Sequence, residues 1–250
     1  KPVTRYFDRI TRPEQIIQSF PNAVQTMLDP ADCGPACISL CQDIQGQTFE
    51  YPEEFFKERV HSIRRPRPDD FQVKEAAEKI KKSKNPIIIS GGGVFYSNAM
   101  EELSNFATKH NIPVTQTVMG YSTMKRDHSH YAGQIGGLGG KNTNDLAKET
   151  DLAIAVGTKL ADFTTGSWAN FENENFKLVS INVSRFDANK HLAQAVVGDA
   201  KVSLIELSKA LGDWKVGDEW NEKSQRELKI WNEHIDKESA PTNQEVPSYV

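Results

Sequence analysis

Pro86-Ile87-Ile88-Ile89-Ser90-Gly91-Gly92-Gly93-Val94 joins a β-branched apolar run to three consecutive glycines. The run is typical of a buried strand, and the glycines allow a turn in which backbone approaches backbone or a ligand. Asn98 and Glu101 follow with the spacing of a capping box. They predict a helix whose inner face carries Met100, Leu103, Phe106, Ala107 and His110. The stretch therefore predicts a strand, a tight turn and a helix.

Gly91, Gly92 and Gly93 are the candidate cofactor-binding residues, because a glycine turn at a helix N-terminus attracts phosphate groups. The turn lacks the G-x-G-x-x-G spacing of a dinucleotide fingerprint. The next apolar strand, 113–118, ends without the carboxylate that would bind an adenosine ribose. Two interpretations stay open, a nucleotide crevice and a turn that only packs strand against helix, and we expect the second.

Strand and helix patterns alternate from residue 69 to about 212. Strands are predicted at 86–90, 113–118, 152–156, 177–183 and 193–197, and helices at 70–82, 98–110, 142–149 and 200–211. The glycine-rich passage 133–140 is expected to be a loop, and Asp199 is expected to cap the last helix. This alternation predicts an α/β fold with a Rossmann-like, doubly wound parallel sheet.

The segments on either side have different patterns. Residues 1–46 indicate a truncated α/β unit, with a helix over 13–28 and a buried strand over 36–41. The inward side chains expected on that helix are Ile16, Ile17, Phe20, Val24 and Leu28. Prolines among charged residues predict a linker over 47–68. Trp220, Leu228, Trp231 and Ile235 predict a helix that lies on a surface by its apolar face and ends before Pro241.

Composition restricts the partners and the compartment. The 250 residues have a net charge of −4, and the basic residues are scattered, so we expect no binding to nucleic acid or to a membrane. No apolar run approaches the roughly 20 residues of a membrane span, and no signal peptide opens the sequence. We therefore expect a cytoplasmic protein. Because Lys1 is not an initiator methionine, we expect this chain to be a fragment of a longer one.

Two groups of residues could bind a metal. Cys33, Cys37 and Cys41 lie four residues apart, without the spacing or the fourth ligand of a zinc site, and we expect them to be small buried hydrophobic residues. His128 and His130 form an H-x-H pair, but the sequence offers no third ligand nearby. We expect these histidines to serve loop packing or a subunit contact.

The order of the motifs resembles a known family. The motifs are Gly34-Pro35 before a strand, the glycine turn at 91–93, Ile112-Pro113-Val114, the run 151–157 and Gly198-Asp199-Ala200. They are similar to thiamine-diphosphate-dependent enzymes of the acetohydroxyacid synthase and pyruvate oxidase group, which consist of a pyrimidine-binding, a middle and a diphosphate-binding domain. The resemblance implies that 1–46 ends the first domain, 47–68 is a linker, 69–212 is the middle domain and 213–250 is a helical linker towards the third domain.

The runs 5–15, 29–35 and 163–167 resemble a member of this group from myo-inositol catabolism. The resemblance implies a homo-oligomeric parent hydrolase that uses thiamine diphosphate and Mg²⁺ to cleave a ring C–C bond beside a diketone. It also implies that the catalytic glutamate and the Gly-Asp-Gly metal motif lie outside this chain. Gly198-Asp199-Ala200 lacks the third glycine of that motif. We therefore expect no catalytic residue, no metal ligand and no bound cofactor in this chain, which contacts the remaining domains of its own enzyme.

Some relatives bind FAD or ADP on the middle domain through the first glycines, an arginine and an acidic run. This chain has Lys159 and the run 182–185, Asn-Val-Ser-Arg, at those places. A lysine meets a phosphate as a point charge rather than as a bidentate fork. Two alternatives stay open: a nucleotide-binding module of an acetohydroxyacid synthase-like enzyme, and an NAD-dependent enzyme of Rossmann or sirtuin type. The second would need a ribose carboxylate or paired zinc cysteines.

Overall fold

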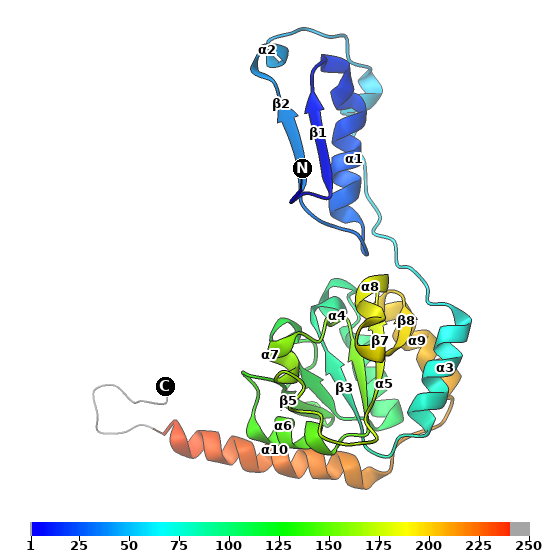
Figure 1. Ribbon diagram of the computed structural model, residues 1–250, viewed down its shortest axis with the longest axis vertical. Helices are drawn as coiled ribbons and strands as arrows, with labels where there is room; N and C mark the ends of the chain where they lie inside the picture. Colours follow the sequence, from blue (N-terminus) through cyan, green and yellow to red (C-terminus); the bar gives the residue numbers. More distant parts are fainter. Residues whose placement is uncertain (1, 241–250) are drawn as a thin grey trace. The chain divides into compact units, whose positions relative to one another are not determined.

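Six parallel strands form the sheet of the larger of two structural units (Figure 1). The computed structural model describes residues 2–240, and the chain divides into its two units after Arg65. The strands of the larger unit are β3 (Pro86–Ser90), β4 (Val114–Gln116), β5 (Tyr131–Gln134), β6 (Leu152–Val156), β7 (Lys177–Asn182) and β8 (Gln194–Val197). Their order in the sheet is β5-β4-β3-β6-β7-β8. In chain order this is 3-2-1-4-5-6, the order of the Rossmann fold.

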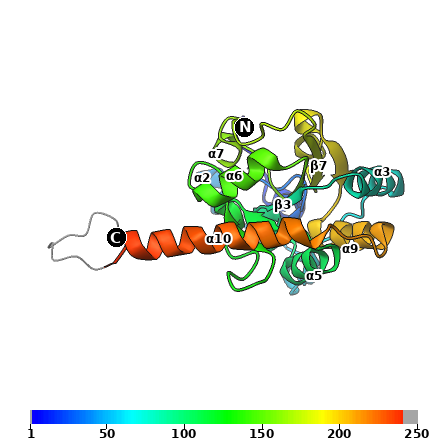
Figure 2. The same cartoon turned by 90° about the horizontal axis from the view of Figure 1, so that it is seen from below.

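Helices cover both faces of the sheet. On one face, α3 (Asp70–Lys81) and α5 (Met100–His110) both pack against α9 (Ala200–Leu211). Figure 2 shows α6 (Lys141–Glu149) and α7 (Asp162–Thr165) on the opposite side of the sheet from α5 and α9. The predicted doubly wound α/β fold is therefore confirmed.

The core lies between these layers. Every residue of β3 and of β6 is buried, as expected for parallel strands covered on both faces, where apolar residues run continuously instead of alternating. The predicted inner face of α3 is buried as well, and consists of Val73, Ala76, Ala77 and Ile80. Asp199 accepts hydrogen bonds from the N–H groups of Lys201 and Val202 at 3.0 and 3.4 Å, which confirms that it caps α9.

One strand was missing from the sequence prediction. The passage 133–140 was expected to be a loop, but its beginning belongs to β5 at the edge of the sheet. Gly133 lies inside this strand with φ +108°, and the pairing of β4 with β5 shifts between Val114 and Thr115. A short strand with a glycine at an irregular position has no β-branched run, and the sequence pattern therefore does not show it.

The predicted capping box at Asn98 and Glu101 is wrong. A short helix, α4 (Gly92–Tyr96), begins within the glycine turn, and α5 follows with Ala99 at its N-cap and no side-chain cap bond. Asn98 has φ +52° and turns the chain between the two helices. Asparagine tolerates this left-handed conformation, so it serves as a turn residue here. The predicted inner face of α5 is otherwise confirmed, because Leu103, Phe106, Ala107 and His110 are buried.

The smaller unit contains a two-stranded parallel sheet. Its strands are β1 (Tyr6–Ile10), which the sequence analysis did not predict, and β2 (Ala36–Leu40), and the helix α1 (Ile16–Leu28) packs against both. Its short helices are η1 (Pro13–Gln15), α2 (Gln42–Gln45) and η2 (Glu53–Phe56). The predicted inward position of Phe20 is wrong, because this side chain is 53% exposed while Ser19 and Ala23 are buried.

The expected burial of the cysteine strand is also wrong. Leu40 is 52% exposed, Cys33 is exposed, and Cys37 and Cys41 are only partly buried. A sheet of two strands with a single packed helix cannot cover its second face, so residues with a core-like pattern reach the surface within this unit.

The helix α10 (Asp218–Glu238) packs on α6 and on the edge strand β5. Trp220 and Leu228 are buried, and the indole N–H of Trp220 donates to the carbonyl oxygen of Pro86 at 2.8 Å. The side-chain amide of Gln225 donates to the carbonyl oxygen of Tyr131 at 2.9 Å and satisfies part of the sheet edge. Pro241 lies outside the described residues. No helix within residues 2–240 is long and apolar enough to cross a membrane.

Candidate functional site

The glycine turn lies where the strand order reverses. β3 and β6 are neighbours at the centre of the sheet, and the chain proceeds from them towards opposite edges. Ligands of open α/β sheets bind outside the carboxyl ends of strands at such a point. Gly91, Gly92 and Gly93 follow β3 directly, and Gly157 follows β6. The structure therefore places the three candidate glycines at the point where the strand order reverses.

Two backbone hydrogen bonds join the loops that follow β3 and β6 at this point. The N–H of Gly91 donates to the carbonyl oxygen of Val156 at 2.9 Å, and the N–H of Gly93 donates to the carbonyl oxygen of Gly157, also at 2.9 Å. A phosphate group at a glycine turn is bound by free backbone N–H groups. Two of the three glycine N–H groups are already engaged by the neighbouring loop.

The absence of side chains at these positions is a packing requirement. A Cβ added to Gly91 would lie 2.5 Å from the carbonyl oxygen of Gly157, and one added to Gly93 would lie 2.6 Å from the Cα of Gly157. Gly157 has φ +60° and approaches Gly93 equally closely. Gly92 differs, because its φ is not left-handed and its nearest neighbour, the carbonyl oxygen of Met119, would lie 3.2 Å from an added Cβ.

A network of buried polar side chains lies beside the last residue of β3, directly before the glycine turn. The hydroxyl of Ser90 donates to the carbonyl oxygen of Thr115 at 3.1 Å and lies 2.8 Å from the hydroxyl of Thr123. The side-chain amide of Gln116 donates to the carbonyl oxygen of Met124 at 2.9 Å. Buried polar groups that satisfy one another hold a backbone in one arrangement. The network therefore holds the end of β3 against the segment that follows β4.

Lys159 and the run 182–185 lie in the loops that follow β6 and β7, at the same end of the sheet. The side-chain amide of Asn182 donates to the carbonyl oxygen of Thr158 at 3.2 Å and accepts the N–H of Ser184 at 2.9 Å. This asparagine joins the loops that follow β6 and β7. Asn182 thus holds the backbone of both loops.

A carboxylate that the sequence analysis missed lies in the short helix α8 (Arg185–Ala188). Asp187 pairs with Lys190 at 2.6 Å. Partial burial opposes the ionisation of Asp187, but the hydrogen bond and charge of Lys190 and the charge of Lys159 outweigh it and hold the pKa below its usual value. The signal was present, since the acidic residue comes only two positions after Arg185. The positive charge of Lys159 therefore stabilises the ionised carboxylate of Asp187.

Large apolar side chains surround this end of the sheet. Exposed examples in the segments after β3, β4, β6 and β7 are Phe95, Tyr96, Val118, Met119, Tyr121, Phe163, Phe186 and Leu192, and we call them the apolar rim. Leu192 is fully exposed, with φ +57°. Scattered apolar residues are ordinary on a protein surface, whereas a contiguous apolar patch is typical of an interaction surface. The sequence analysis quoted Phe163 only as part of the run 163–167 and did not single out the other residues of this group.

The histidine pair is engaged by its own loop. The Nε2 of His130 lies 3.0 Å from the amide oxygen of Asn111, and its Nδ1 lies 3.0 Å from the hydroxyl of Ser129. The Nδ1 of His128 accepts the backbone N–H of His130 at 3.1 Å. Burial lowers the pKa of His130, and the charge of His128 lowers it further. Within residues 2–240, no three His, Cys, Asp or Glu side chains are grouped so that they could hold a metal ion.

Comparison with known proteins gives a consistent result. Residues 73–207 match the family model described as thiamine pyrophosphate enzyme, central domain. A protein of Clostridium perfringens is 43% identical over 235 residues, which cover 94% of this chain and 37% of the relative. Proteins of Clostridium botulinum and Bacillus velezensis are 47% and 43% identical over 84% and 92% of this chain, and over 33% and 38% of their own lengths.

All three relatives are named 3D-(3,5/4)-trihydroxycyclohexane-1,2-dione hydrolase, and this chain spans less than two fifths of the length of each. The family model covers more than half of the chain, from α3 into α9, and includes all six strands of the sheet. With its Rossmann-like sheet and this match, the chain belongs to the thiamine pyrophosphate enzyme family and contains the central domain of that family.

Proposed function

We propose that this chain is the central part of a 3D-(3,5/4)-trihydroxycyclohexane-1,2-dione hydrolase. The parent enzyme would use thiamine diphosphate with Mg²⁺ to open the cyclohexane ring to 5-deoxyglucuronate in inositol catabolism, in the cytoplasm. The identity to relatives with this name supports the proposal, since it reaches 43% over 94% of this chain. When bound, the cofactor supplies an ylid that adds to a carbonyl and stores the resulting carbanion.

The role that we propose for this chain is structural. One observation carries it: the N–H groups of Gly91 and Gly93 donate to the carbonyl oxygens of Val156 and Gly157, where a ligand phosphate would need them. The residues present therefore do not fit a diphosphate with its metal ion, and we derive no catalytic step from the crevice. We propose that Gly91, Gly92 and Gly93 are a turn retained for packing.

We also propose a domain assignment for the parent. Residues 1–46 would end its pyrimidine-binding domain, 47–68 would be a linker, 69–212 the middle domain and 213–250 a helical linker towards the diphosphate-binding domain. The match of the central-domain model to residues 73–207 supports the third assignment. The division of the structure after Arg65 supports a boundary within the proposed linker.

The apolar rim is, in this proposal, a contact surface for the remaining domains and for further copies of the enzyme. Phe186 is 75% exposed at the rim, and Phe71 is 69% exposed on α3. In the parent enzyme, Phe186→Glu should weaken assembly as measured by light scattering, since a buried unpaired charge is costly. Phe71→Glu is the matched control and should leave assembly unchanged. Equal assembly of wild type and Phe186→Glu would contradict this role of the rim.

The function is tested with two proteins, the parent enzyme and this chain alone. The parent should consume the trihydroxycyclohexanedione in the presence of thiamine diphosphate and Mg²⁺. This chain alone should neither consume it nor bind the cofactor in a calorimetric titration. An inactive, folded parent would refute the proposed activity. Micromolar binding of thiamine diphosphate by the chain alone would refute its structural role.

A further inference from the structure

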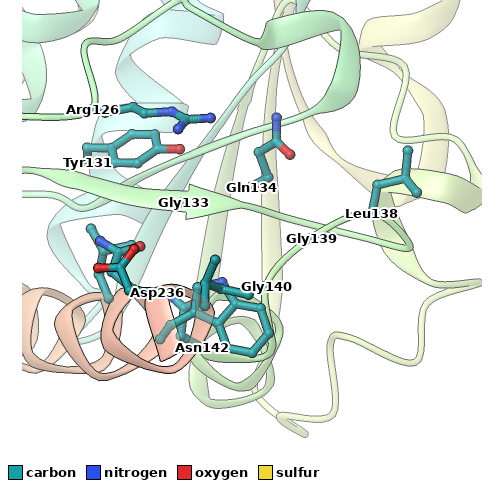
Figure 3. A pocket seen from close by; sticks show the side chains of 13 residues that line it. Arg126, Tyr131, Gly133, Gln134, Leu138, Gly139, Gly140, Asn142 and Asp236 are labelled. Atoms are coloured by element: carbon teal, nitrogen blue, oxygen red, sulfur yellow. The ribbon is translucent and has the colours of Figure 1, made fainter. Parts of the chain in front are cut away.

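A cavity of about 520 Å³ lies apart from the glycine crevice, between the edge strand β5, the N-terminus of α6 and the C-terminal half of α10 (Figure 3). The strand contributes Gln134, the turn before α6 contributes Gly140, and α10 contributes Trp231 and Asp236. Neither the crevice nor the apolar rim uses these four residues. The cavity therefore needs an explanation of its own.

One buried polar atom in this cavity has no protein partner. Asn142 is 7% exposed, and its amide Nδ2 donates to the carbonyl oxygen of Ala132 at 3.1 Å. Its Oδ1 is buried and has no hydrogen-bond partner among residues 2–240. If the amide were flipped by 180°, Oδ1 and the carbonyl oxygen of Ala132 would face each other as two acceptors. The hydrogen bond from Nδ2 therefore fixes the orientation of the amide. A buried unsatisfied acceptor is costly, and a ligand that donates a hydrogen bond would satisfy it.

A free donor lies next to this acceptor. A Cβ added to Gly140 would clash with Asn142 Oδ1 and would lie 2.7 Å from Trp231 Nε1. Both polar atoms therefore pack directly against Gly140, and a residue with a side chain at this position would displace them. Within the described part of the chain, the indole N–H of Trp231 makes no hydrogen bond. The turn thus presents one acceptor and one donor side by side.

The remaining walls carry both kinds of polar group and apolar surface. Arg126 donates from Nη2 to the hydroxyl of Tyr121 at 3.0 Å and keeps further N–H groups on its guanidinium. Gln134 and Asn232 add amides, and Asp236 adds a carboxylate. One arginine and one aspartate leave the walls with no net charge. The apolar part of the lining is Leu138, Leu228, Ile235 and the indole of Trp231.

This combination selects a class of ligand. An anion would satisfy Arg126 and the N-terminus of α6 but would leave Asn142 Oδ1 and Asp236 without donors. A cation would leave Arg126 and the Trp231 N–H without acceptors. A hydroxyl both donates and accepts, and the C–H face of a polyhydroxylated ring packs on an indole. We propose that this cavity binds a neutral polyhydroxylated ring, a cyclitol or a sugar, with one hydroxyl between Asn142 Oδ1 and Trp231 Nε1.

The experiment measures binding to the purified chain by calorimetry and by saturation-transfer NMR. The probes are myo-inositol and glucose, with inorganic phosphate and glycine as an anion and a zwitterion. A cyclitol or sugar should bind, while phosphate and glycine should not. Because this site lies apart from the crevice, the result does not depend on the ring-opening activity proposed above.

Two variants locate the binding. Trp231→Phe keeps an aromatic ring but removes the N–H, and should weaken binding about fivefold, the loss of about one neutral hydrogen bond. Gly140→Ala should abolish binding, because its methyl group would clash with Asn142 Oδ1 and Trp231 Nε1 and displace both polar atoms. Ile230→Ala, at an exposed position of α10, and Gly217→Ala, with nothing within 4 Å of the added Cβ, are the controls and should bind as wild type.

Three outcomes would overturn the proposal. They are the absence of binding by both polyols, preferential binding of phosphate or glycine, and unchanged binding by Trp231→Phe. A circular dichroism spectrum and a melting curve check that each variant is folded. Should Gly140→Ala fail to fold, Trp231→Phe still decides the question, because an exchange of aromatic rings at a half-buried position leaves the backbone in place.

Discussion

Gly93 donates its backbone N–H to the carbonyl oxygen of Gly157 at 2.9 Å, and neither residue has room for a side chain. This contact joins the loops after β3 and β6, the two central strands of the sheet. The glycine turn thus meets another glycine of the same chain at the place where related folds bind a ligand. Its consequences for stability and for ligand binding can be measured separately.

Gly93→Ala should destabilise the chain by about 2 kcal/mol, because its Cβ would lie 2.6 Å from the Cα of Gly157 and the backbone would have to move. Gly92→Ala is the matched control in the same turn. Its φ is not left-handed and its closest neighbour would be 3.2 Å away, so its cost should stay below about 1 kcal/mol. Urea denaturation measures the free energy of unfolding of both variants. An equal decrease in Gly93→Ala and Gly92→Ala would contradict the packing role of Gly93.

FAD, ADP and NAD should leave the melting temperature of the chain unchanged. The N–H groups of Gly91 and Gly93 already donate to carbonyl oxygens, so a phosphate gains little by displacing them. A ligand that binds only the folded state raises the melting temperature by mass action. A rise with any of the three nucleotides in the wild type but not in Gly93→Ala would show that the turn is a nucleotide site.

His110 should make the chain less stable in mild acid. Its Nδ1 lies 2.7 Å from the carbonyl oxygen of Trp214 and its Nε2 lies 3.0 Å from the hydroxyl of Ser208, which fits a neutral ring with the proton on Nδ1. Burial lowers its pKa from the usual 6.5. The unfolded chain therefore takes up a proton first as the pH falls below about 6.5, and the free energy of unfolding decreases.

His110→Gln should reduce this pH dependence below about pH 6.5, measured by urea denaturation at several pH values. Part of the dependence should remain, because the pKa of His130 is lowered as well. His61→Gln, at an exposed position, controls for the loss of one histidine. An identical pH dependence in wild type and His110→Gln would refute the assignment.

Trp220→Phe should cost about 1–2 kcal/mol, because the carbonyl oxygen of Pro86 would lose its donor at 2.8 Å while it stays buried. Hydrogen exchange should then be faster in α10 than in α9, since the indole attaches α10 to the start of β3. The control Ile230→Ala changes an exposed side chain on the same helix and should stay within about 0.5 kcal/mol of wild type. Unchanged stability of Trp220→Phe would contradict this attachment.

Replacement of Cys33, Cys37 and Cys41 together by alanine should leave the metal content of the purified chain unchanged. Cys33 is exposed and should contribute less than about 0.5 kcal/mol, while the partly buried Cys37 and Cys41 should each cost more than Cys33. Elemental analysis and urea denaturation check the two expectations. Stoichiometric zinc or iron that disappears in the triple variant would refute the packing role of these residues.

Local patterns were sufficient where a segment is buried on both faces or capped by its own neighbours. β3 and β6 were predicted at their observed bounds, because strands that are covered on both sides carry unbroken apolar runs. The cap at Asp199 was also predicted, since an N-cap bond is made within three residues. The family resemblance of the middle domain was also visible in the sequence, because its motifs are short and continuous.

Local patterns failed where distant residues decide the outcome. β5 contains Gly133 at φ +108° and is a strand only because β4 pairs with it on one side and α10 covers it on the other. Phe20 belongs to the apolar pattern of α1, yet it is exposed because the surrounding sheet has only two strands. The elements that pair with β5, and the number of strands beside Phe20, cannot be identified from the neighbouring residues in the sequence.

The sequence by itself determined that a buried strand ends at Ser90 and that three residues without side chains, Gly91, Gly92 and Gly93, follow it, because an unbroken apolar run marks a strand covered on both faces. Only the tertiary structure decided that a helix, α4, begins at Gly92 and which backbone these glycines approach. The partner, Gly157, follows β6, the strand that the sheet order places beside β3, and its carbonyl oxygen accepts the N–H that a ligand would use. The cavity beside Asn142 has the same origin, since β5, α6 and α10 meet there only after the sheet has formed.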